Sequence, residues 1–389
     1  MLNRRSLRVK ALQNIYAFDQ CQKANYELAL EEIKAAFAPD LNSMEEQNLG
    51  LLEENKKNAQ RIFRENFNHL KIDIQEGGEI EPVIRSAVDH AFRFYNENGA
   101  KDKKFLKNLM VTEAEKVNNR YLSVLLLLAE FGSLASGDRF KKPEKFRSIN
   151  LLNNKVIKAI NDDSAIQQEA IRKNISWSNH GAEVLHWYRD LLSKDETFLE
   201  YQKISDPGLE DDKNIIKHIT KNLIFKHETI QLFFEEIDLY WEEDRAIVKS
   251  MVLKTIKSVE VAEDGTSELE QSQLSYNWED DRDFFEKLFL ETIANDSDYE
   301  EKIAVKAKNW DIDRLALIDK IIIKMAICEM INFPSIPVKV TINEYIELSK
   351  NYSTPKSKQF VNGILDVLAE EMMAEGLVKK SGRGLIDNK

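Results

Sequence analysis

The sequence predicts an all-α protein. Its 389 residues include only 7 prolines and 13 glycines, and no proline occurs from Gly208 through Phe333. Long proline-free stretches favour helices, because proline removes a backbone donor and clashes with the preceding turn. Apolar residues also recur at three- and four-residue spacing, which is typical of helices that bury one face.

The composition is that of a globular protein. Hydrophobic residues make up 43% and charged residues 31%, and the formal net charge is −12. Disordered chains lack enough apolar content to offset their ordering entropy. The two cysteines, Cys21 and Cys328, cannot build a disulfide framework and fit a reducing compartment. The longest apolar run, Val124–Ala129, is far shorter than the roughly 20 residues of a membrane span. We therefore expect a cytoplasmic protein without a membrane segment.

Residues 4–19 are predicted to form the first helix. Leu7, Ala11 and Ile15 fall on one apolar stripe, and residues 1–18 carry four basic and no acidic side chains. Cations at a helix start are unfavourable for the helix dipole, and a bound phosphate would relieve that cost. The alternative is a solvated charged face or a frayed end.

Residues 21–277 contain apolar clusters that indicate a series of helices. The cluster at 121–135 is apolar nearly all round, which predicts a buried helix. Gly132 and Gly137 have P-loop spacing, but Asp138 follows where the motif has lysine, so a phosphate cradle is not expected.

The last third predicts three helices with short connections, which form a compact bundle. The first spans 311–331, and a capping box at Thr341–Glu344 opens the second, which runs to Tyr352. Thr354 and Pro355 are expected at the N-cap and first position of the third, which ends near Gly376. Gly363, inside that helix, is expected to permit close helix packing.

Three segments resemble the NusB family of transcription antitermination factors. One is the arginine-rich start, from Arg4-Arg5 and Arg8 to Asp19, and another runs from Asp313-Arg314 to Glu329. The most specific contains Ile342-Asn343-Glu344, Glu347-Leu348 and Phe360-Val361-Asn362-Gly363-Ile364-Leu365-Asp366. The resemblance covers residues 1–20 and about 278–375.

The resemblance implies two small helical bundles, of which the first is interrupted by a large all-helical insertion. It also implies boundaries: 1–20 as the first helix of the N-terminal bundle, 21–277 as the insertion, 278–310 as the rest of that bundle, 311–378 as the C-terminal bundle and 379–389 as a basic tail.

Family resemblance further implies a function without catalysis, cofactor or metal. Such proteins bind single-stranded boxA RNA of ribosomal RNA operons with the ribosomal protein NusE, and the complex helps RNA polymerase read through terminators. By position, RNA contacts would come from Arg4, Arg5, Arg8, Lys10, Tyr352, Lys356, Ser357 and Phe360. Contacts with NusE would come from Tyr16 and Asp319. Lys356 departs from the family pattern, in which an acidic residue is common.

Residues 352–360 independently suit single-stranded RNA, which proteins bind by aromatic stacking and by cations that neutralise phosphate. The alternative is that Phe360 belongs to the core and Tyr352 caps a hydrophobic staple. Tyr16 could instead be a half-buried residue with its hydroxyl in water, and Asp319 an ordinary exposed helix position.

A helical protein-interaction scaffold that has lost RNA binding remains an alternative. An enzyme is disfavoured, because the six histidines show no zinc-site spacing and no Gly-rich cofactor loop follows the NusB-like region.

Overall fold

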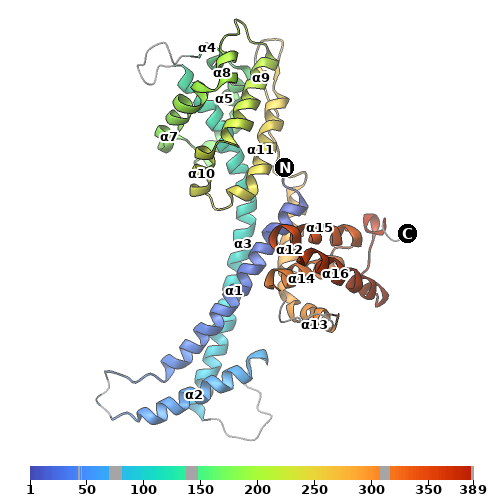
Figure 1. Cartoon of the computed structure of the whole chain (residues 1–389). Coiled ribbons are helices and arrows are strands. Elements are labelled where there is room, and N and C mark those ends of the chain that lie inside the picture. The colour runs from blue at the N-terminus through green and yellow to red at the C-terminus, as the bar shows by residue number, and fades with distance from the viewer. Residues whose placement is uncertain (43, 45, 70–80, 137–147, 307–315, 387–389) are drawn as a thin grey trace. The chain divides into compact units, whose positions relative to one another are not determined.

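The computed structural model describes all residues except 43, 45, 70–80, 137–147, 307–315 and 387–389. The described residues are almost entirely helical, which confirms the predicted all-α class (Figure 1). Strands β1 (Glu260–Val261) and β2 (Ser267–Glu268) form a short antiparallel hairpin. Among the described residues, no helix combines the length and the apolar content that crossing a membrane requires.

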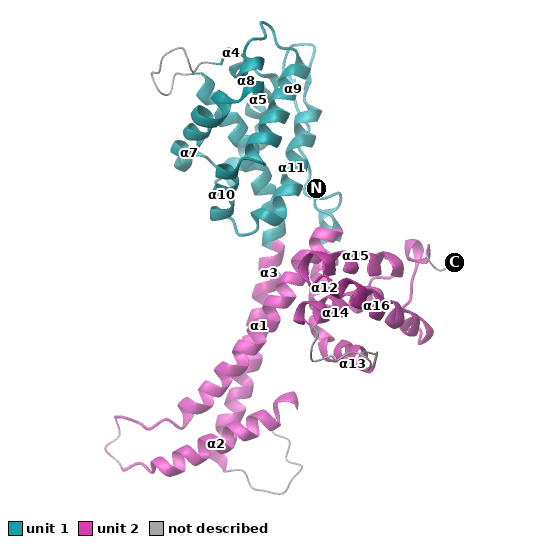
Figure 2. Ribbon diagram, viewed as in Figure 1, with its two compact units in different colours: residues 1–3, 112–281 teal, residues 4–111, 282–389 magenta. Residues whose placement is uncertain are grey.

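The chain divides into two compact units (Figure 2). Unit 1 contains residues 1–3 and 112–281, and unit 2 contains residues 4–111 and 282–389. Helices α3 (Pro82–Ala135) and α12 (Trp278–Ala294) carry the chain from one unit to the other. The domain boundaries expected from the sequence stay a prediction.

Unit 1 is built around the second half of α3. This half is buried over most of its circumference from Tyr121 to Ala135, as expected for the apolar cluster there. Its Tyr121 hydroxyl lies 2.7 Å from Thr255 Oγ1 in α11 (Trp241–Ser258). The other helices of unit 1 are α4 (Ile149–Leu152), α5 (Lys155–Asp162), α6 (Ser164–Arg172), α7 (Gly181–His186), α8 (Glu196–Tyr201), α9 (Leu209–His218) and α10 (Glu228–Ile237). The second half of the P-loop-like spacing lies outside the described residues.

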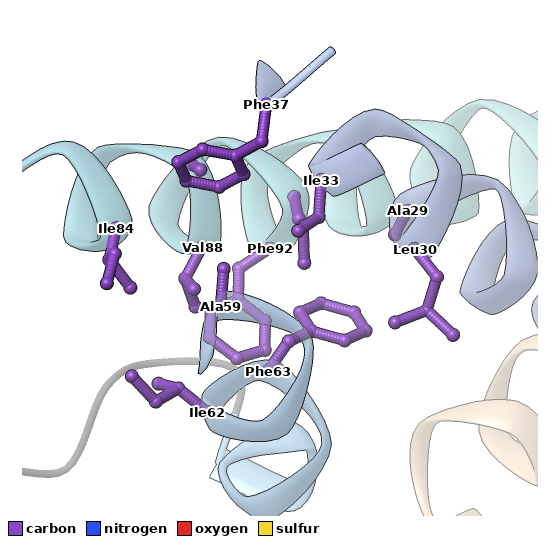
Figure 3. Close-up of a cluster of buried hydrophobic side chains, with 12 residues drawn as sticks. Ala29, Leu30, Ile33, Phe37, Ala59, Ile62, Phe63, Ile84, Val88 and Phe92 are labelled. Carbon is purple, nitrogen blue, oxygen red and sulfur yellow. The ribbon is translucent and has the colours of Figure 1, made fainter. Parts of the chain in front are cut away.

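One part of unit 2 is formed by three helices that pack together: α1 (Arg4–Ala36), α2 (Leu49–Glu65) and the first half of α3. The first helix is therefore longer than the predicted span of 4–19. Its second half packs on α2 and α3 through the buried cluster in Figure 3, where Phe63 stacks on Phe92 with ring centroids 4.8 Å apart. Nearer the middle of α1, a Cβ at Gly99 of α3 would meet Gln22 Nε2 at 2.9 Å, so a small residue lets the two helices approach closely.

The other part of unit 2 is a compact helical bundle. It contains α12 from Arg282 onward, α13 (Asp296–Lys306), α14 (Leu317–Asn332), α15 (Val338–Tyr352) and α16 (Ser357–Ala374). The last three correspond to the predicted three-helix bundle, although residues 311–315 of the first predicted helix lie outside the described residues. Helix α16 ends as expected, because Gly376 has a φ of +71° and its amide closes the last turn on Met373.

Three local predictions for the bundle were wrong. Helix α15 begins at Val338, so Thr341 lies inside it and is no N-cap; its hydroxyl bonds to Glu329 of α14 instead. Helix α16 begins at Ser357, which leaves Thr354 and Pro355 in the preceding turn. Gly363 does not permit close packing, because a Cβ there would meet nothing within 4 Å.

Candidate nucleic-acid interface

The first turns of α1 are attached to the bundle by a buried ion pair. Arg8 Nε and Nη2 each lie 2.7 Å from a carboxylate oxygen of Glu329, and both side chains are almost fully buried. The Thr341 and Tyr345 hydroxyls donate to the same carboxylate, at 2.9 and 3.1 Å. Burial lowers the pKa of Arg8, but the hydrogen bonds and charge of Glu329 outweigh that effect and raise the pKa overall. Arg8 therefore docks α1 and offers no exposed guanidinium to a phosphate.

Arg5 lies one turn earlier, on the surface. Its Nε and Nη2 donate to the two carboxylate oxygens of Glu344 in α15, at 2.9 and 2.8 Å. The Arg5 side chain is 52% exposed, whereas that of Glu344 is 19% exposed. The hydrogen bonds from Arg5 hold the pKa of Glu344 below its ordinary value. The result is a solvent-facing guanidinium with a carboxylate already in its fork.

Glu347 connects Arg5 with cations near the start of α16. It forms an ion pair with Lys350, and its pKa is lowered first by that hydrogen bond and further by the charges of Arg5 and Lys358. Arg5 in the first turn of α1 and Lys350 near the end of α15 are thus both paired with carboxylates of α15, Glu344 and Glu347. Together with the exposed Lys356, these cations form what we call the cationic strip: Arg5, Lys350, Lys356 and Lys358.

The α15–α16 turn is fixed by hydroxyl groups. Ser357 Oγ donates to Asp319 Oδ2 of α14 at 2.6 Å, and the hydroxyls of Ser353 and Thr354 lie 2.9 and 2.8 Å from it. Ser357 and Asp319 are both buried. The network fixes the position of the exposed Lys356 one residue before α16.

The predicted site residues thus separate into two groups. Arg5, Tyr16 and Lys356 are exposed, and Arg4 and Tyr352 are half-buried. The Arg4 guanidinium lies 4.8 Å from the ring centroid of Phe284. The second group is buried: Arg8, Lys10, Ser357, Phe360 and Asp319. Asp319 contacts Ser357 of this chain, so it presents no exposed carboxylate to a partner.

Sequence reasoning missed the three carboxylates that surround these cations. Glu329, Glu344 and Glu347 all belong to the quoted motifs, but Glu344 was assigned to a capping box. The three-residue spacing of Glu347 and Lys350 signals an ion pair within a helix. No local signal exists for Arg5 and Glu344, which are 339 positions apart.

No group of three or more His, Cys, Asp or Glu residues that could hold a metal ion occurs in the described part of the chain.

Comparison with known proteins finds relatives for the C-terminal third of the chain. The sequence profile of the NusB family matches residues 246–370. "Transcription antitermination protein NusB" of Chloroherpeton thalassium is 50% identical over 95 residues, which are 24% of this chain and 45% of that protein. The protein of the same name from Salinibacter ruber is 44% identical over 87 residues, 22% of this chain and 54% of that protein.

A third relative is covered more completely. The protein of that name from Natranaerobius thermophilus is 37% identical over 111 residues, which are 28% of this chain and 77% of that protein. The chain spans about half the length of the first two relatives. No solved structure matches the chain at a significant level.

Proposed function

The chain belongs to the NusB family, and from this premise we propose that it is a cytoplasmic antitermination factor without catalytic activity. Its ligand is single-stranded boxA RNA of ribosomal RNA operons, bound together with the ribosomal protein NusE. The assembly then joins RNA polymerase in an antitermination complex.

The cationic strip is the observation that carries this proposal. Arg5 and α15 belong to segments far apart in the sequence, yet Arg5 is hydrogen-bonded to Glu344 of α15, one turn from the Glu347–Lys350 ion pair. Exposed cations suit the phosphates of an extended strand, and the half-buried Tyr352 at the end of α15 suits stacking with a base. Within the strip, Arg5, Lys356 and Lys358 are the proposed phosphate contacts.

The buried residues of the predicted site take a supporting role. Arg8 docks the first turns of α1, which brings Arg5 to α15. Ser357 and Asp319 position the turn that carries Lys356. On the same helix as Arg5, Tyr16 is 41% exposed and is the proposed contact with NusE.

Salt-dependent RNA binding tests the proposal. A boxA-like single-stranded RNA with a fluorescent label is titrated with the full chain at several salt concentrations. Each phosphate contact contributes about −0.7 to the log–log slope, so Arg5→Gln and Lys356→Gln should each flatten it by about that amount. Lys221→Gln is the matched control, because Lys221 is an exposed cation of unit 1.

The scaffold function is the competing outcome, and the pairing of Arg5 and Arg8 with glutamates favours it. Slopes that are identical in the wild type, Arg5→Gln and Lys356→Gln would support it and contradict RNA binding by the strip. Retention of purified NusE by the wild type but not by Tyr16→Ala would support the partner assignment separately.

A further inference from the structure

The Arg5 guanidinium already has an anionic ligand. Glu344 accepts from its Nε and Nη2 in the two-bond arrangement that a phosphate would also use. An RNA phosphate that takes both bonds must therefore displace the Glu344 carboxylate.

Glu344 can be displaced without undocking α1. Its second cationic neighbour is Arg8, with Nη1 3.5 Å from Glu344 Oε2, but Arg8 is held by two shorter bonds to Glu329. Glu347, one turn further along α15, is paired with Lys350. Of Glu344 and Glu347, Glu344 is therefore the one that accepts both hydrogen bonds from an exposed arginine.

We propose that Glu344 makes an autoinhibitory contact at the interface, because its carboxylate competes with phosphate for Arg5. The inference rests on the proposed RNA function and adds a contact that limits RNA affinity. A lone phosphate that displaces Glu344 exchanges one anion for another and gains little. An RNA strand that also reaches Lys356 and Lys358 gains contacts with two further exposed cations.

Glu344→Gln removes the competing charge and keeps the size of the side chain. For an exposed ion pair, the expected gain in RNA affinity is about two- to fivefold at physiological salt. The gain should be of similar size for boxA-like RNA, for a short random-sequence RNA and for inorganic phosphate, since every phosphate that takes the Arg5 fork displaces the same carboxylate.

Glu347→Gln is the matched control. It removes the same charge from the same helix, but Glu347 is hydrogen-bonded to Lys350 and acts on Arg5 only through space. Its effect on affinity should stay below about twofold, because screened charges interact weakly. An equal gain in both variants would indicate general charge repulsion and overturn the proposal.

A double-mutant cycle with Arg5→Gln isolates the competition. In the wild-type background Arg5→Gln frees Glu344 and loses one phosphate contact, whereas in the Glu344→Gln background it loses an uncontested contact. The affinity loss should therefore be about two- to fivefold larger in the second background. Equal losses in the two backgrounds would refute the competition.

The outcomes separate this inference from the function on which it rests. If the wild type binds RNA with a salt slope that depends on Arg5 and Lys356, but Glu344→Gln gains nothing, the function stands and the competition is wrong. If no variant binds RNA, both are wrong. Hydrogen exchange of α15, unchanged between Glu344→Gln and wild type, would show that the fold is kept.

Discussion

Replacing Arg8 by methionine should destabilise unit 2 strongly. Met keeps the apolar stem but leaves the Glu329 carboxylate, which is 0% exposed, with only the hydroxyls of Thr341 and Tyr345. Breaking a buried ion pair by removing one partner costs about 3–5 kcal/mol. The exposed Arg5 pair gives the contrast, because Arg5→Met should cost less than about 1 kcal/mol.

Hydrogen exchange of the α14 and α15 amides is the appropriate assay. The tryptophans among the described residues lie in unit 1, so intrinsic fluorescence does not report on α14 and α15 selectively, whereas hydrogen exchange follows individual helices. At about 1.4 kcal/mol per tenfold change, the most protected amides should exchange two to four orders of magnitude faster in Arg8→Met.

A second substitution makes the reasoning refutable if Arg8→Met does not fold. Arg8→Met combined with Glu329→Gln removes both charges, and the amide oxygen still accepts hydrogen bonds from the two hydroxyls. Protection should therefore recover in part. Exchange in Arg8→Met as slow as in Arg5→Met, or a double variant no better than the single one, would show that the buried pair does not hold α1 to the bundle.

Three other predictions concern α16 and its surroundings. Ser357→Ala removes the donor to the buried Asp319 carboxylate, and thermal unfolding should show a loss of about 1–3 kcal/mol. Gly363→Ala should raise the free energy of unfolding by up to about 1 kcal/mol, because Gly363 is exposed inside a helix and a Cβ there meets open space. Gly376→Ala should lower the free energy of unfolding by about 1 kcal/mol, since Gly376 has a φ of +71°. Urea unfolding measures both changes, and two changes of the same sign would contradict this reasoning. Burial lowers the pKa of Lys380 to about 8 from 10.5, so the folded state binds fewer protons in that interval. The unfolding free energy should then rise from pH 8 to 10.5 relative to Lys380→Met, and parallel pH profiles would contradict it.

Local patterns predicted what local forces decide. The apolar cluster at 121–135 predicted a buried helix because its periodicity leaves no polar face, and it is buried in the structure. The end of α16 followed from Gly376, since glycine readily adopts a left-handed conformation. Each of these two predictions used only residues of a single helix.

Tertiary contacts decided the positions that sequence reasoning got wrong. Thr341 fits a capping box, but its hydroxyl instead satisfies the carboxylate of Glu329 on another helix. Arg8 resembles a free surface cation in the sequence, and only the folded chain brings Glu329 to it, 321 positions away. A burial pattern for the first helix cannot show which arginine is docked and which is exposed.

The path of the chain through unit 2 explains how the long segment between α1 and α12 is accommodated. Helices α1 and α3 run in opposite directions, as shown by the hydrogen bond of 2.7 Å between Asn25 and Asp102 and the approach of His90 to Glu32. Helix α3 thereby brings the chain back toward the start of α1, where Lys107 lies 3.2 Å from Glu286 of α12. The chain leaves unit 2 after residue 111 and re-enters it at residue 282, so its exit and return are joined by this ion pair. Loop-closure entropy grows only with the logarithm of length, and an ordered excursion that ends where it began adds little further cost. The N-terminal arginines can therefore meet α14 and α15 despite more than 300 intervening residues.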